Sequence, residues 1–110
     1  MNDSIQVWMD KAERAGTLAC GVRLPDRSFI VRSCRPEIAE DHVSQAMRAL
    51  AETVYALQQN RITADRLRWN FENARIRCVT KPGGVVGALF LPAVAADLPE
   101  IDQLLAEFTI

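Results

Sequence analysis

Residues 66–91 read RLRWNFENARIRCVTKPGGVVGALFL, and this stretch decides the fold. Apolar and polar side chains alternate over Arg66–Glu72, which is the period of a strand with one buried face. A second strand is predicted over residues 75–80, and the sequence KPGG at 81–84 is a strong turn signal. Residues 85–91 are apolar on both faces, as is typical of a central strand. The stretch therefore predicts a meander of three strands.

The chain before this stretch contains a predicted hairpin. Over residues 17–24, larger apolar side chains alternate with mostly small ones, which indicates a strand covered on both faces. The sequence PDR at 25–27 is typical of a turn, and residues 28–34 are predicted to form a second strand that pairs with the first.

Helical periodicity surrounds these strands. Apolar side chains recur at helical spacing over residues 5–16, from about residues 36–41 to Gln59, and over residues 97–108. The predicted order is therefore α-β-β-α-β-β-β-α, a three-layer α+β arrangement. At 110 residues the chain fits one domain, which we expect to span residues 1–110.

This order resembles the roadblock / dynein light chain family across essentially the whole chain. The local match is best over residues 16–31, which read GTLACGVRLPDRSFIV, and over residues 66–91 with the helix that follows. The resemblance implies a five-stranded antiparallel sheet, with the second helix on one face and the first and third helices on the other. It also implies dimers that extend the sheet and pack the second helix against its mate.

Charge and hydropathy argue against several partners. Lysine and arginine number 13 against 14 aspartate and glutamate residues, so the formal net charge is −1, without the basic surplus that nucleic-acid binding needs. The longest apolar run, residues 85–91, is too short to span a bilayer, and the N-terminus lacks a signal-peptide pattern. We therefore expect a cytoplasmic protein with no nucleic-acid or membrane partner.

The chain shows no pattern of catalytic, metal-binding or cofactor-binding residues. His42 is the only histidine, and Gly83-Gly84 lies in a turn without the lysine and hydroxyl residue of a phosphate-binding loop. The three cysteines, Cys20, Cys34 and Cys78, have no metal or redox spacing, so we expect reduced core residues. We predict a protein that is not an enzyme and carries no metal and no tightly bound cofactor.

One cluster of charged residues stands out from the rest of the sequence. Strand alternation places four arginines on one face of two neighbouring strands: Arg66, Arg68, Arg75 and Arg77. They form a solvated sheet face that the first and third helices do not reach, or a docking patch for an acidic protein surface. A nucleic-acid stripe is the third alternative, which the scarcity of aromatic side chains on that face disfavours. Glu72 lies among them and could balance part of their charge. We expect Arg68 and Arg77 to be exposed and to contribute to docking rather than to folding.

The second predicted helix carries more apolar surface than one sheet can cover. Its centre should lie on the sheet: Val43, Met47, Leu50 and Val54. One flank has small side chains that would let a second helix approach closely: Ala46, Ala49, Thr53 and Ala56. The other flank, Ala51 and Tyr55, is the alternative contact. With Trp69 on a predicted edge strand, the first flank predicts the interface of a homodimer.

Three functions compete at this point. The resemblance implies a regulatory or scaffolding dimer that binds a small Ras-like GTPase or a signalling or motor complex. A small dimeric secretion-type chaperone is the alternative, although such a chaperone should be clearly acidic and this chain is nearly neutral. An enzyme or small-molecule sensor of related fold would need a deep polar pocket, for which the sequence offers no residues.

Overall fold

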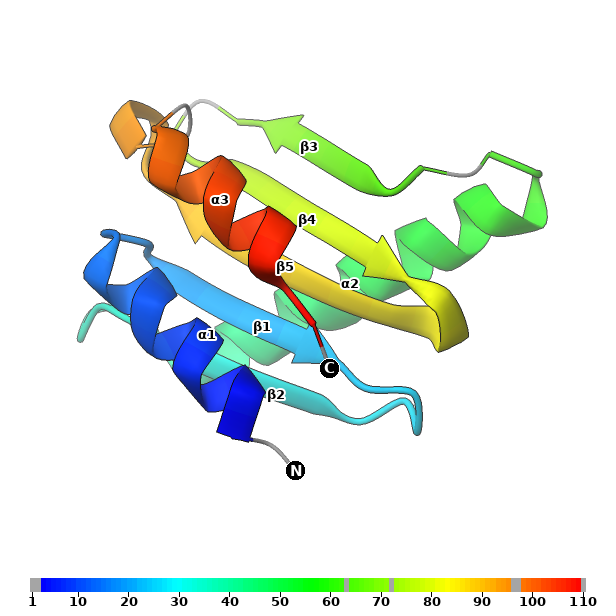
Figure 1. The fold of residues 1–110 in the computed structure, drawn as a ribbon, viewed down its shortest axis with the longest axis horizontal. Coiled ribbons are helices and arrows are strands. Elements are labelled where there is room, and N and C mark those ends of the chain that lie inside the picture. The colour runs from blue at the N-terminus through cyan, green and yellow to red at the C-terminus, as the bar shows by residue number, and fades with distance from the viewer. Residues whose placement is uncertain (1–2, 63, 72, 96–97, 110) are drawn as a thin grey trace.

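The computed structural model describes residues 3–62, 64–71, 73–95 and 98–109 of the chain. Its elements follow the predicted order (Figure 1): α1 Asp3–Arg14, β1 Ala19–Arg23, β2 Phe29–Ser33, α2 Glu40–Gln59, β3 Arg66–Asn70, β4 Arg75–Lys81, η1 Pro82–Gly84, β5 Val85–Leu91, η2 Ala93–Ala95 and α3 Pro99–Glu107. The predicted strand ending at Glu72 ends at Asn70 instead. Glu72 and Asp97, the predicted start of the last helix, lie outside the described residues.

The strands form one antiparallel sheet in the order β2-β1-β5-β4-β3. Strand β5 lies in the centre, with Ala88 opposite Gly21 of β1 and Cys78 of β4. This confirms the prediction of a five-stranded antiparallel sheet with an apolar central strand. Strands β2 and β3 form its edges.

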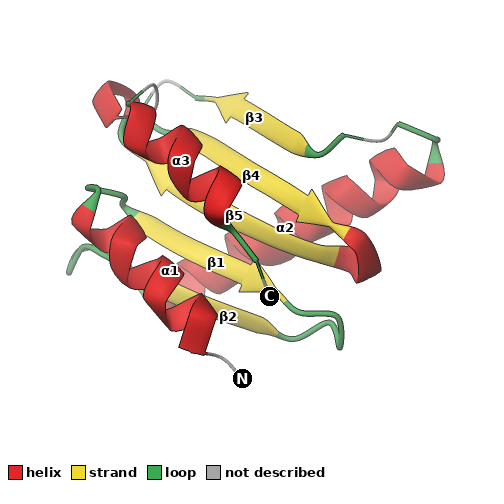
Figure 2. Cartoon of the chain, in the orientation of Figure 1, coloured by secondary structure: helices red, strands yellow, loops and turns green. Residues whose placement is uncertain are grey.

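Helices cover both faces of the sheet, with α1 and α3 on one side and α2 on the other (Figure 2). On the first side, α1 and α3 contact each other as well as the sheet. The Trp8 indole Nε1 donates to the carbonyl of Leu104 at 2.7 Å, and its ring meets Phe108 edge-on at 4.9 Å. The buried indole thus keeps its one donor satisfied while it joins the two helices.

Helix α2 packs mainly on β1 and β2 rather than over the middle of the sheet. Its predicted inner residues are all buried: Val43, Met47, Leu50 and Val54. Met47 lies directly on Gly21 of β1, where a Cβ atom would approach the Met47 Sδ to 2.7 Å. The missing side chain of Gly21 therefore lets the helix lie close to this half of the sheet.

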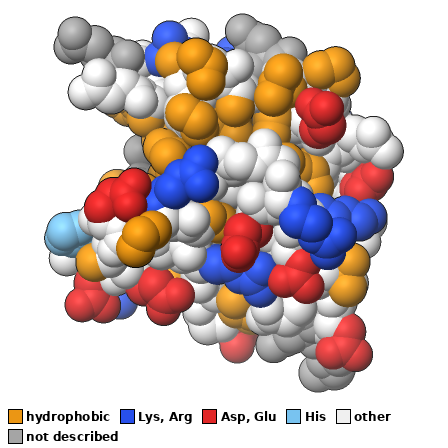
Figure 3. All heavy atoms as spheres, turned by 90° about the vertical axis from the view of Figure 1, so that its left-hand side faces the viewer, with side chains coloured by type: hydrophobic (Ala, Val, Ile, Leu, Met, Phe, Trp, Pro, Cys, Tyr) orange, Lys and Arg blue, Asp and Glu red, His pale blue; other side chains and the backbone are white. Residues whose placement is uncertain are grey.

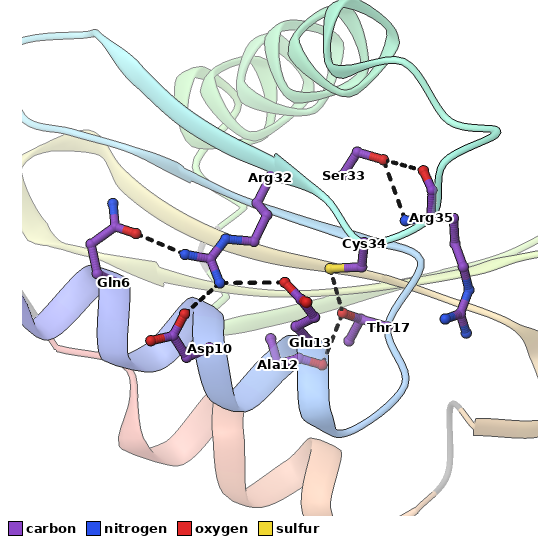
Figure 4. A network of polar contacts seen from close by, with 9 residues as sticks. All are labelled: Gln6, Asp10, Ala12, Glu13, Thr17, Arg32, Ser33, Cys34 and Arg35. Atoms are coloured by element: carbon purple, nitrogen blue, oxygen red, sulfur yellow. Dashed lines mark hydrogen bonds and ion pairs between the residues drawn. The ribbon is translucent and has the colours of Figure 1, made fainter.

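A polar network holds α1 against the edge strand β2 (Figure 4). The Arg32 guanidinium donates to Asp10 Oδ1 at 2.6 Å and to Gln6 Oε1 at 2.8 Å, and it lies 3.5 Å from Glu13 Oε1. Nearby, the buried Thr17 hydroxyl donates to the Ala12 carbonyl at 2.9 Å. Because the Asp10 and Glu13 side chains are more than half exposed, these ion pairs add specificity to the packing more than stability.

Candidate interaction site

The described residues offer little for catalysis. Among them, no group of three or more histidine, cysteine or acidic side chains could hold a metal ion. His42 is exposed near the start of α2. In the same part of the chain, no helix combines the length and hydropathy needed to cross a bilayer.

The cysteines are free, and two of them are buried: Cys20 and Cys78. Burial raises the pKa of the Cys20 thiol to about 12, with the neighbouring Cys34 adding to the effect. Burial likewise raises the pKa of the Cys78 thiol to about 11. Both groups are therefore protonated thiols at neutral pH, which makes them poor nucleophiles.

This difference in burial predicts the reactivity of the three thiols. At pH 7.5, iodoacetamide should label the folded protein at most once, at the half-buried Cys34, because the other two thiols are buried and protonated. After denaturation in guanidinium chloride, all three should react. Intact-mass and peptide mass spectrometry count the labels, and rapid labelling of Cys20 or Cys78 in the folded protein would contradict this assignment.

The strand register confirms that the four arginines share one face of β3 and β4, since Arg68 lies opposite Arg77 and Asn70 opposite Arg75. Their environments nevertheless differ. Arg66 and Arg68 are exposed. Arg75 is half-buried and donates to the carbonyls of Phe71 and Ala74, so it stabilises the turn between the strands.

Arg77 corrects the sequence prediction. It was expected on an exposed face, but it is only 7% exposed. Its Nη1 donates to Asn70 Oδ1 and to the Ile76 carbonyl, both at 3.2 Å. Helix α3 contacts β4, so this helix layer reaches the strand that the solvated-face interpretation left uncovered. The exposed part of the patch is therefore centred on Arg66 and Arg68.

The opposed pair Arg68 and Arg77 provides a matched test of this difference. Arg77→Glu should lower the free energy of unfolding by roughly 3 kcal/mol, because it places a carboxylate among groups that accept hydrogen bonds. Arg68→Glu should change it by less than about 0.5 kcal/mol, since its side chain is in solvent. Urea denaturation of both variants measures the two values. Equal changes in the free energy of unfolding would show that the difference in burial between Arg68 and Arg77 does not matter for stability.

The two flanks of α2 have different surroundings. On the predicted interface flank, Ala46 is half-buried, whereas Ala49, Thr53 and Ala56 are exposed. The Thr53 hydroxyl donates to the Ala49 carbonyl at 2.9 Å, so its polar group is satisfied within the helix. Trp69 is half-buried and packs against the core beneath α2.

The apolar surface continues beyond α2. Half-buried side chains of the other strands pack against the edge of the α2 core: Leu67, Trp69, Ile76 and Phe90. Figure 3 shows hydrophobic side chains gathered at the end of the molecule where η2 lies. Phe71 is 55% exposed and Val94 is 89% exposed. The structure thus leaves apolar surface open on the β3 side of the sheet.

The other flank of α2 forms a wall of a cavity that the sequence analysis did not find. The cavity has a volume of about 550 Å³ and lies between α2, the turn that joins β1 to β2, and the start of β5. Ala51 and Tyr55 line it, together with Arg23, Arg27 and Arg48. The only signal in the sequence is Arg23, a charged residue that ends a buried strand.

A search of solved structures finds one chain that supports this architecture. The chain is similar to the Roadblock/LC7 domain from Streptomyces avermitilis, with a TM-score of 0.60 and 16% sequence identity over 91% of this chain and 90% of that chain. A second match, MglC from Myxococcus xanthus, has a TM-score of 0.49 and 18% identity over 96% of this chain and 99% of that chain. A scan against family models gives no match, and neither does a search of curated proteins.

The layers and strand order define an α+β domain with a five-stranded antiparallel sheet between one helix and two. More specifically, the chain has the Roadblock/LC7 fold, as the resemblance of residues 16–31 and 66–91 predicted.

Proposed function

We propose that this chain is a non-enzymatic, dimeric regulatory or scaffolding domain of the cytoplasm that binds a small Ras-like GTPase or a subunit of a signalling or motor complex. The half of the sheet beside α2 carries the proposal, because its apolar side chains are only half-buried in the described part of the chain: Leu67, Trp69, Ile76 and Phe90. The GTPase class comes from the roadblock resemblance, and the fold supports that resemblance.

The edge strand β3 supports a homodimer. Among the described residues, strand β3 pairs with β4 alone, so the backbone groups along its outer side can pair with a second copy. On α2, Ala49, Thr53 and Ala56 present small exposed side chains, and the Thr53 hydroxyl is satisfied within the helix. We propose that two copies pack these flanks antiparallel about a two-fold axis, with Ala46 and Trp69 at the border of the contact.

The homodimer predicts the effect of a charge on α2. Ala49→Glu should give a monomer or an insoluble protein, because two carboxylates would enter a desolvated seam, where an unpaired charge costs several kcal/mol. Val7→Glu is the matched control, since Val7 is 52% exposed on α1 in the opposite layer. Light scattering at micromolar concentration measures the mass. A monomeric wild type, or an unchanged dimer with Ala49→Glu, would rule out this interface.

The exposed arginines are the proposed docking residues for the partner. Arg66→Glu combined with Arg68→Glu should weaken capture of a small GTPase from an extract of the native host, because it reverses the charge facing an acidic surface. Arg75 and Arg77 belong to the same patch, but their hydrogen bonds to the strands make charge reversal there a test of folding.

The capture experiment is run with GTP and GDP analogues, and mass spectrometry identifies the bound protein. We expect a GTPase whose capture depends on the nucleotide and falls in the double variant, while the thermal midpoint stays unchanged. If the wild type captures no GTPase with either analogue, the GTPase class is wrong. If the double variant captures it equally well, Arg66 and Arg68 are not the docking site.

A further inference from the structure

The cavity on the Tyr55 flank of α2 combines positive charge with aromatic walls. Its lining comes from separate parts of the chain and includes three arginines, two aromatic side chains and one carboxylate: Arg23, Arg27, Arg48, Phe29, Tyr55 and Glu52. At about 550 Å³ it falls within the range of small-molecule sites, which run from roughly 300 to 1,000 Å³. It is separate from the small-residue flank of α2 to which we assign the homodimer.

The charge in the cavity is not balanced. Three arginines line it against a single carboxylate, Glu52, and in the described part of the chain none of the four forms an ion pair. The whole chain carries a net charge of −1, so this local excess of positive charge is not a general property of the surface. Guanidinium groups gathered without carboxylate partners favour an anion between them.

The fold holds one of these arginines in place. Arg23 Nη1 donates to the Gly84 carbonyl at 2.5 Å, which is the one hydrogen bond of its side chain within the described residues. Gly84 has a φ of +79°, and a Cβ atom there would lie 2.5 Å from Arg23 Nη1. The positive φ therefore favours glycine, which also leaves room for the Arg23 guanidinium, and most of the Arg23 donors remain for a ligand.

The nearest acidic residue in the turn does not neutralise Arg27. Asp26 Oδ1 accepts hydrogen bonds from the Ser28 backbone at 2.9 Å and from the Ser28 hydroxyl at 2.5 Å. These hydrogen bonds lower the pKa of Asp26 and commit its carboxylate to the turn. Arg27 itself has a φ of 73° and lies exposed at the tip.

The aromatic side chains indicate what else the ligand carries. Phe29 forms a half-buried wall, and Tyr55, at 63% exposure, lies on the rim of the cavity. Aromatic faces beside guanidinium groups suit a ligand with a planar ring as well as an anionic group.

We propose that this cavity binds a nucleoside phosphate, with the phosphate on Arg23, Arg27 and Arg48 and the base against Phe29 and Tyr55. Because Arg27 and Arg48 are exposed, the ligand exchanges freely with solvent. This agrees with the expectation that the domain holds no tightly bound cofactor. The site does not depend on the homodimer or on the GTPase partner.

Isothermal titration with AMP, ADP, GMP and GDP at low ionic strength tests the proposal, with adenosine, guanosine and inorganic phosphate as partial ligands. At least one nucleotide should bind saturably, about tenfold or more tightly than its nucleoside or phosphate alone, because each part meets only half of the site. Binding should weaken as salt is added. No saturable binding, or phosphate binding as tightly as every nucleotide, would overturn the proposal.

Four variants locate the site. Arg48→Ala and Arg48→Glu should each weaken nucleotide binding about tenfold or more, and Tyr55→Ala should weaken the nucleotide but not inorganic phosphate. Arg14→Glu, an exposed arginine on α1 outside the cavity, is the control and should bind like the wild type. Circular dichroism confirms that each variant is folded. Equal losses in Arg48→Glu and Arg14→Glu would show nonspecific attraction and contradict the assignment.

Discussion

Strand β5 has to bury both of its faces, and the rest of the structure depends on this constraint. Its side chains enter two different cores: Val85, Leu89 and Leu91 pack with α1 and α3, whereas Val86, Ala88 and Phe90 pack with α2. The fold buries both faces by placing a helix layer on each face of the sheet and a neighbouring strand along each edge of β5. Close contact also needs glycine, since the Phe108 ring lies where a Cβ atom of Gly87 would be.

The single helix on the α2 side cannot cover a sheet of five strands, and its position decides what remains open. Met47 on Gly21 holds α2 over the β1 and β2 half. The β3 half therefore keeps a row of half-buried apolar side chains, which is the kind of surface that a second protein covers. On its other flank, α2 stands beside the turn after β1 and encloses the arginine-lined cavity. Both proposed surfaces follow from the displacement of one helix.

The strands were predictable because period-two alternation and an apolar central strand are local signals in the sequence. The five-stranded sheet and the side on which each helix lies were implied by the roadblock resemblance. How deeply a side chain is buried cannot be read from the local sequence pattern. Alternation placed Arg77 on the correct face, but its burial depends on α3, which meets β4 only after folding. The cavity was invisible for the same reason. Arg23, Arg48 and Gly84 lie far apart in the sequence, and no spacing rule joins them.

The arginines of the sheet and α2 differ in what surrounds their charge. Arg32 meets Asp10 and Glu13, while Arg75 and Arg77 donate to backbone carbonyls and to Asn70. Two carboxylates therefore compensate the charge of Arg32. The hydrogen bonds of Arg75 and Arg77 hold their side chains against the strands. The cavity differs because three arginines gather there beside one carboxylate, Glu52, and in the described part of the chain none of the four forms an ion pair. Uncompensated guanidinium groups in a concave, partly apolar site attract anions more strongly than the same charges spread over an open surface.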